Sequence, residues 1–217
     1  MKKQVIFTAT GFLLAVLSFS SCKKSTSSGP DVSASIKGKT WTGEQNYSGK
    51  SVEPISIEFA DGGSLSYHEV KGDFDGTWKL DGTKLTINVD GSLAFKADVS
   101  TDDKLTGIVS SDASGRTLNN ANLNTGDDKP LDGTAWQATG VGFKFKAGNL
   151  VDLIFGNNLA APPSYPNMSY VRKGKSIRFF ALPTYKWFMT VNSSTSMKGA
   201  NLAPGDPFVY TYLSIKQ

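Results

Sequence analysis

Residues 84–99 read KLTINVDGSLAFKADV, and this stretch decides the class of fold. In residues 85–89 and again in residues 93–99, apolar side chains alternate with mostly polar ones. This period of two is typical of half-buried antiparallel strands. Between the two runs stands Asp90-Gly91, a pair that accepts the positive φ angles of a tight turn. The stretch therefore predicts a β-hairpin.

The same pattern continues on both sides of this hairpin. Residues 55–59, ISIEF, alternate in the same way, and turn signals such as Asp61-Gly62 and Lys173-Gly174 recur at short intervals. The chain holds 24 aromatic residues and 22 glycines but four glutamates, so strand and turn formers are plentiful while a main helix former is scarce. The sequence therefore predicts an all-β protein.

An internal repeat underlies this pattern. Residues 36–41, IKGKTW, match residues 131–136, LDGTAW, at an offset of 95 positions. Eight further positions match in kind at a constant offset of 92, for example Trp78 with Tyr170. Self-similarity of this kind indicates one structural unit present twice.

The repeat sets the expected domain boundaries. Loops of unequal length explain the change of offset, and we place the longer ones at residues 45–54 in the first copy and 156–168 in the second. The two copies then cover residues 36–124 and 131–217, with a linker over residues 125–130.

The number of strands favours a particular architecture. Counting the runs between turns gives about eight short strands in each copy. Many short, evenly spaced strands are typical of up-and-down barrels and of sandwiches. We expect two tandem, small, antiparallel up-and-down β-barrels, with a β-sandwich or one merged larger barrel as the alternatives.

The N-terminus reads as an export signal. Lys2 and Lys3 precede an apolar run over residues 5–19, and Ser20-Ser21 then leads to Cys22. This arrangement resembles the lipobox of bacterial lipoproteins. The resemblance implies cleavage after residue 21, a lipid on Cys22 and attachment to a membrane. We expect a flexible tether over residues 22–35 and an outer-membrane location facing the periplasm, with the cell surface as the alternative.

Two short motifs carry a second resemblance. Gly38-x-x-Trp41 and Gly133-x-x-Trp136 open the copies, and the first copy contains a strand-turn-strand unit over residues 76–85. Each copy resembles the small lipocalin-like domains of exported lipoproteins of the Bacteroidetes type. That family implies a small apolar ligand, such as a lipid, inside the barrel. The predicted lining residues are Ile57, Phe59, Tyr67, Trp78, Leu85, Ile87, Phe95 and Val99 in the first copy, and Phe143, Phe145, Tyr170, Ile177, Phe179, Trp187 and Met189 in the second.

Composition excludes several other classes of function. The chain has one cysteine and one histidine, so thiolate or histidine-clustered metal sites and intramolecular disulfides are ruled out. Without residues 1–21 the chain carries 21 basic and 19 acidic residues, a net charge of +2, which does not suit nucleic-acid binding through the overall field. We expect no cofactor and no metal.

Catalysis has weak support in the sequence. His68 lies in a run whose alternation turns it outward, where we expect an exposed side chain. The neighbouring acids Asp73 with Asp75, and Asp102 with Asp103, lie in segments that we interpret as turns, where acids usually cap or solvate the chain. We therefore predict a non-catalytic protein and keep a hydrolase as a third hypothesis.

The two copies differ in charge and in their outer faces. The first holds nine basic and thirteen acidic residues, and the second nine basic and three acidic, so their net charges of −4 and +6 should attract. The second copy also places apolar side chains opposite its inward set, and the predicted surface patch consists of Tyr165, Phe180, Leu182 and Phe188. Such a face either packs against the first copy or binds a protein or carbohydrate. This interaction module is our alternative to the ligand carrier.

Overall fold

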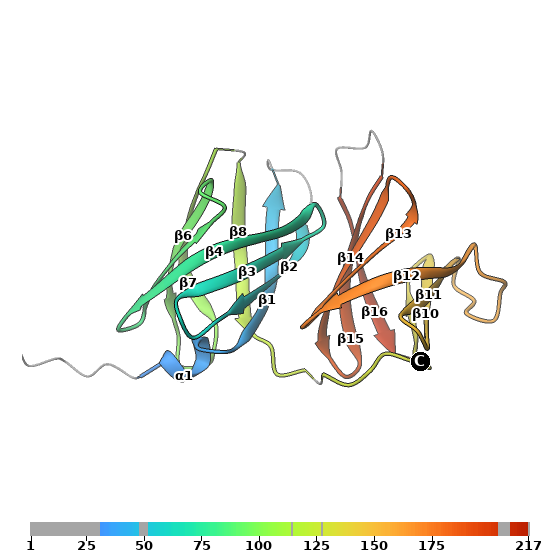
Figure 1. Ribbon diagram of the computed structural model, residues 1–217, viewed down its shortest axis with the longest axis horizontal. Helices are drawn as coiled ribbons and strands as arrows, with labels where there is room; N and C mark the ends of the chain where they lie inside the picture. Colours follow the sequence, from blue (N-terminus) through green and yellow to red (C-terminus); the bar gives the residue numbers. More distant parts are fainter. Residues whose placement is uncertain (1–30, 48–51, 114, 127, 204–208, 217) are drawn as a thin grey trace, which may run out of the picture.

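A computed structural model describes residues 31–47, 52–113, 115–126, 128–203 and 209–216. The predicted signal over residues 1–21, Cys22 and the first part of the tether lie outside the described residues. The described residues form an all-β, antiparallel fold with sixteen strands and one short helix, α1 (Ser33–Ile36). Figure 1 shows how these elements are arranged. Among the described residues there is no helix with the length and apolar character needed to cross a bilayer.

The first sheet contains eight strands in the order β7-β6-β5-β4-β3-β2-β1-β8, each antiparallel to its neighbours. Apart from β8, consecutive strands are neighbours, which is the up-and-down arrangement. Its strands are β1 (Thr40–Tyr47), β2 (Val52–Phe59), β3 (Ser64–Glu69), β4 (Gly72–Asp81), β5 (Lys84–Val89), β6 (Leu93–Val99), β7 (Leu105–Asp112) and β8 (Arg116–Leu123).

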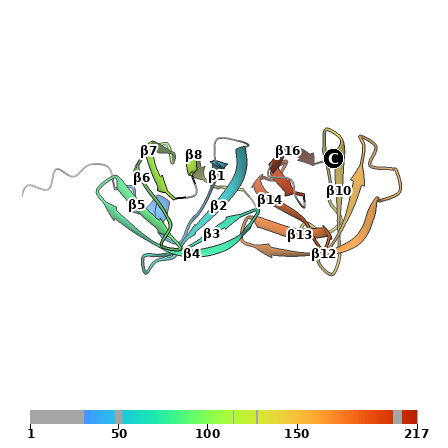
Figure 2. The ribbon, with the colours of Figure 1, turned by 90° about the horizontal axis from the view of Figure 1, so that it is seen from above.

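The second sheet also contains eight strands, and its pairing closes into a barrel in the order β10-β11-β12-β13-β14-β15-β16-β9. Seen from above, it lies beside the first sheet (Figure 2). Its strands are β9 (Ala135–Ala138), β10 (Val141–Lys146), β11 (Leu150–Phe155), β12 (Tyr165–Lys173), β13 (Ser176–Leu182), β14 (Tyr185–Ser193), β15 (Ser196–Leu202) and β16 (Val209–Lys216). We call the two sheets with their connections the first and the second half.

The halves differ in how the last pair of strands meets. In the second half, β16 pairs with β9 through Ile215↔Gln137 and Lys216↔Trp136. In the first half, β7 and β8 form no ladder between named strands, and a single bridge joins residue 104 to residue 122. The all-β antiparallel class is thereby confirmed, whereas closure of both sheets by strand pairing is not.

Each half has its own apolar core, built from the inward side of the alternation. The predicted lining residues of both copies all belong to these cores. In the first half, α1 and the residue before it add Val32 and Ile36 to the core. The tether predicted over residues 22–35 is therefore wrong at its end, because Val32 is buried and residues 33–35 belong to a helix.

The predicted loops are also shorter than expected. Gln45 pairs with Glu53 and Glu44 with Pro54, so strands β1 and β2 extend through most of the loop predicted over residues 45–54. Likewise β12 begins at Tyr165, inside the loop predicted over residues 156–168. Polar residues at these strand ends interrupt the alternation of apolar and polar side chains by which strands are recognised in the sequence.

Candidate functional site

The interiors of the two sheets, where the sequence predicts an apolar ligand, are occupied by the protein's own rings. In the first half, the Phe59 ring lies 6.5 Å from Trp41 and 5.7 Å from Trp78, edge to face in both cases. In the second half, Phe179 stacks on Trp187 with ring centroids 5.8 Å apart, and Phe143 meets Trp187 edge-on at 5.5 Å. The predicted lining residues are thus brought together, but they pack against one another.

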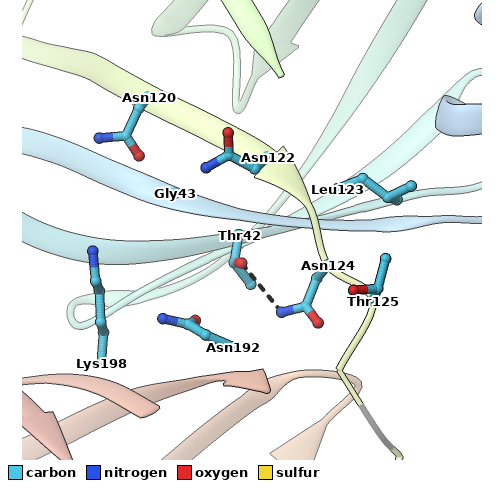
Figure 3. A pocket seen from close by; sticks show the side chains of 9 residues that line it. All are labelled: Thr42, Gly43, Asn120, Asn122, Leu123, Asn124, Thr125, Asn192 and Lys198. Atoms are coloured by element: carbon cyan, nitrogen blue, oxygen red, sulfur yellow. Dashed lines mark hydrogen bonds between the residues drawn. The ribbon is translucent and has the colours of Figure 1, made fainter. Parts of the chain in front are cut away.

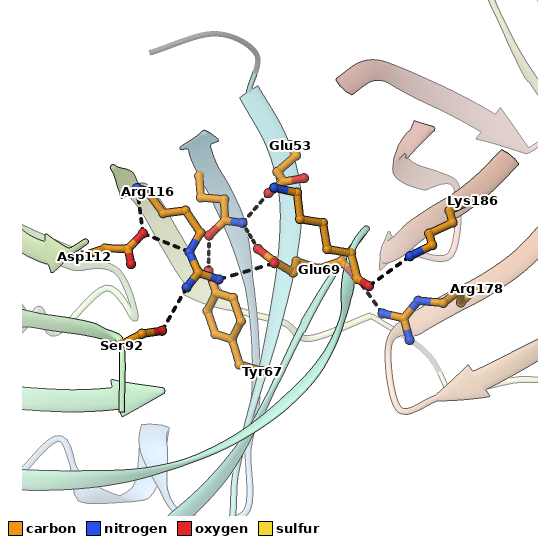
Figure 4. A network of polar contacts seen from close by, with 10 residues as sticks. Glu53, Tyr67, Glu69, Ser92, Asp112, Arg116, Arg178 and Lys186 are labelled. Atoms are coloured by element: carbon orange, nitrogen blue, oxygen red, sulfur yellow. Dashed lines mark hydrogen bonds and ion pairs between the residues drawn. The ribbon is translucent and has the colours of Figure 1, made fainter. Parts of the chain in front are cut away.

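A buried polar cluster lies at one end of the first half (Figure 4). The Gln45 amide donates to both Glu53 and Glu69, and the Tyr67 hydroxyl donates to Gln45 Oε1 at 2.5 Å. Arg116 NH1 lies 3.4 Å from Glu69 Oε1. We call this group, together with Asp112, the buried polar cluster.

Burial and the neighbouring charge of Glu69 change the protonation of Glu53. Removal from water, together with the charge of Glu69, raises the pKa of Glu53 to about 8, although the Gln45 hydrogen bond and the nearby Lys71 ammonium act against the shift. At neutral pH the Glu53 carboxyl is therefore mainly protonated. The proton on Glu53 keeps the cluster from holding two adjacent negative charges.

The same cluster joins the two strands that the backbone leaves apart. Arg116, at the start of β8, donates from Nε to Asp112 Oδ2 at the end of β7, over 3.0 Å, and its backbone N–H reaches the same oxygen at 2.8 Å. Farther along, Leu118 N donates to Ser110 Oγ at 3.0 Å. Side chains therefore supplement a single backbone bridge in closing the first half, whereas a backbone ladder closes the second.

His68 is buried, which corrects the expectation of an exposed side chain. It points out of the first sheet, as predicted, but the second half covers it and leaves 2% of it exposed. Its Nδ1 lies 2.8 Å from Asp73 Oδ1, and its Nε2 lies 3.6 Å from Glu58 Oε1. Burial opposes protonation, but the two carboxylates outweigh it and raise the pKa of His68.

The acids expected in turns occupy two different settings. Asp73 and Asp75 lie within β4, so the turn predicted for them is wrong. Asp102 and Asp103 lie in the turn between β6 and β7, and Asp102 forms an exposed ion pair with Lys104 at 2.5 Å. The structure does not bring the two pairs together.

Complementary charges join the halves, as the net charges suggested. Asp73 forms ion pairs with Arg178 and Lys173 of the second half, both at 2.7 Å. These bonds outweigh the effect of burial and lower the pKa of Asp73. Arg178 NH2 also donates to the Glu69 carbonyl at 2.7 Å. In the turn after β12, Gly174 comes so close to Glu58 that a Cβ at that position would overlap its carboxylate.

The predicted surface patch is divided between this interface and solvent. Phe188 packs against Val70 of the first half and is fully buried, so its assignment to an exposed patch is wrong. Phe180 and Leu182 stay on the surface with 46% and 43% of their area exposed. Tyr165 is half-buried and packs edge-on against Phe155 at 5.9 Å.

A groove of about 200 Å³ lies at the seam between the halves (Figure 3). One wall comes from the start of β1 and the end of β8, and the other from β14 and β15. Four asparagines face it, Asn120, Asn122, Asn124 and Asn192. We call this space the seam groove.

Sequence reasoning missed the buried polar cluster, although its members follow the alternation. Glu53 stands two residues before Ile55, and Glu69 two residues after Tyr67, so each shares the inward face of its strand. That parity is the signal that could have found them. No comparable signal exists for the seam groove, because its walls meet only when the halves dock.

Within the described part of the chain, no three histidine, cysteine or acidic residues are arranged so that they could hold a metal ion. No protein-family model matches this chain, and no curated protein or solved structure matches it either. The functional argument therefore depends on the residues described above.

Proposed function

We propose that this chain is a non-catalytic binding protein attached to a membrane through a lipid on Cys22. The Ser20-Ser21-Cys22 sequence after an apolar run supports the anchor. No acidic run follows Cys22, which favours the outer membrane facing the periplasm over the cell surface. We further propose that both halves are variants of one small lipocalin-like barrel. The matching motifs around Trp41 and Trp136 and the two eight-stranded sheets support that relation.

The observation that carries the binding function is the docking of the two halves. Ion pairs and the apolar contact of Phe188 with Val70 hold them together. The seam between them is consequently formed before any ligand arrives. A preformed groove costs little conformational entropy on binding, which is what a binding protein requires.

A carrier of apolar ligands is the second candidate, favoured by one smaller cavity. At an end of the second barrel, Leu131, Trp136 and Val191 border a space of about 90 Å³. This is about the volume of three water molecules in the liquid.

Native mass spectrometry of the full chain, extracted from membranes in detergent, tests the proposal. We expect acyl groups on Cys22 and a noncovalent small molecule that is lost on unfolding. A Cys22→Ser variant should lose the acyl mass and keep the bound molecule. A protein that carries no acyl group refutes the anchor. If it also arrives empty and its melting temperature is unchanged by lipids and oligosaccharides, the binding function is refuted.

A further inference from the structure

Neutral hydrogen-bonding groups dominate the walls of the seam groove. Asn122 on β8 has an exposed side chain that makes no hydrogen bond within the described part of the chain. Across the groove, Asn192 accepts from Thr190 through its Oδ1 at 3.1 Å, which leaves its NH₂ group available. An amide offers two donor hydrogens beside an acceptor oxygen. The groove therefore suits a ligand that presents donors and acceptors side by side.

The charges at the groove are balanced within the protein. Lys198 Nζ lies 2.5 Å from Glu44 Oε1, and Asn120 donates to the other oxygen of Glu44 at 2.9 Å. Burial opposes ionisation of Glu44, but these bonds outweigh it and lower its pKa. Because the ion pair joins the two walls, the groove offers no net charge to select an anion or a cation.

Asn124 fixes the width of the groove. Its Nδ2 donates to Thr42 Oγ1 at 3.1 Å and to the Val191 carbonyl at 2.7 Å, and so links the two halves directly. Its Oδ1 accepts from the Gly126 N–H at 2.8 Å, which uses the remaining polar atom. Asn124 therefore holds the walls apart at a set distance, while Asn122 and Asn192 remain available to a ligand.

Three of the strands that line the groove are paired on both sides: β1 lies between β2 and β8, β14 between β13 and β15, and β15 between β14 and β16. The fourth, β8, is the last strand of its sheet, and its side without a ladder faces β7. An extended peptide therefore cannot add a strand along β1, β14 or β15, and strand addition is the usual source of affinity for a polar peptide backbone. Hydroxyl groups need no strand edge, because they pair with side-chain amides one by one.

We propose that the seam groove binds one unit of a neutral saccharide, with Asn122 and Asn192 hydrogen-bonding its hydroxyl groups. This inference rests on the proposed binding function and names its ligand class. The volume of about 200 Å³ is roughly that of seven water molecules, which suits a single sugar ring. The groove is open, so the rest of a longer chain would remain in solvent. With no aromatic platform at the groove, we expect a dissociation constant on the order of 1 mM.

Side-chain amide NMR spectra of the full chain in detergent micelles test this proposal. Maltoheptaose, xylohexaose and cellohexaose serve as neutral probes, and an oligomer of galacturonic acid serves as the charged one. We expect at least one neutral probe to shift the amide signals of Asn122 and Asn192. Asn122→Ala and Asn192→Ala should each weaken binding about tenfold, the loss of one well-placed hydrogen bond.

Asn119→Ala is the matched control. Asn119 is exposed on the same strand, bonds to Asn46 at 2.9 Å and does not line the groove, so its replacement should leave binding unchanged. The inference is overturned if no neutral probe shifts these amides, if the groove variants bind as tightly as the parent, or if the charged oligomer binds best. In each of these cases a different molecule found by native mass spectrometry would still uphold the binding function.

Discussion

The two halves share a strand pattern but are completed by different chemistry. The second closes through backbone pairing of β16 with β9 around a stack of aromatic rings. The first leaves β7 and β8 without a ladder and joins them through Arg116 and Asp112 beside two buried glutamates. One pattern of alternating residues thus admits closure by a backbone ladder or by side-chain ion pairs. Stability should consequently depend on different variables in the two halves.

Removal of a stacked ring should produce the largest loss, and it should be confined to the second half. Phe179→Ala deletes a side chain that is 1% exposed, and we expect a cost of about 4 kcal/mol in the free energy of unfolding. Phe180→Ala, at the neighbouring exposed position, should cost less than about 1 kcal/mol. Denaturant titration followed by hydrogen exchange locates the effect. Equal losses for both variants would contradict the packed interior.

Breaking the ionic closure should have the next largest effect, located in the first half. Arg116→Met leaves Glu69 and Asp112 buried without their cation, and we expect a loss of about 3 kcal/mol. Hydrogen exchange should rise first in β7 and β8. Lys104→Met is the control: its ion pair with Asp102 is exposed, so it should cost less than about 0.5 kcal/mol. If Arg116→Met left the free energy of unfolding unchanged, β7 and β8 would be held together without the buried polar cluster.

The pH dependence should separate the halves as well. Because the pKa of Glu53 is raised to about 8 in the folded protein from an ordinary 4.5, its stabilising contribution is complete below pH 4.5 and is lost as the pH rises towards 8. We expect a loss on the order of 3 kcal/mol between pH 5 and pH 8, measured by urea unfolding. Glu53→Gln should flatten this slope. If the variant lost stability with rising pH as steeply as the parent, the pH dependence would belong to another group.

The docked interface should show the smallest effect. Since the pKa of His68 is raised above its ordinary 6.5, the stabilisation from its charged form is present below that pH and fades as the pH rises through the folded value. We expect His68→Gln to cost about 1 kcal/mol at pH 5.5 and less at pH 8. The His68→Gln substitution should be measured in a Glu53→Gln protein, because that background removes the pH dependence due to Glu53. Hydrogen exchange in β3 and β13 measures this cost in stability. A cost that grows as the pH rises would contradict a stabilising role for charged His68.

Local alternation explains why much of the fold could be predicted. Residues 93–99 form β6 as expected, and the rings at Phe95 and Phe179 point inward. The cluster around Glu53 was missed because hydrophobicity alone marked the inward face. His68 was placed on the correct side of its strand, but its covering depends on contacts with residues more than 100 positions away, such as Arg178. The pleat of a strand fixes the face to which a side chain points. The burial of that side chain depends on which part of the protein docks against the face.

The burial of Val32 limits how far this protein can stand from its membrane. If Cys22 carries the lipid, ten peptide steps separate that anchor from the first residue fixed in the core, a reach of roughly 35 Å at full extension. The end of the molecule that carries α1 is then the end nearest the lipid headgroups (Figure 1). Val32 and the core around it would then stay within roughly 35 Å of the membrane surface, so a ligand of this protein would be bound close to that membrane.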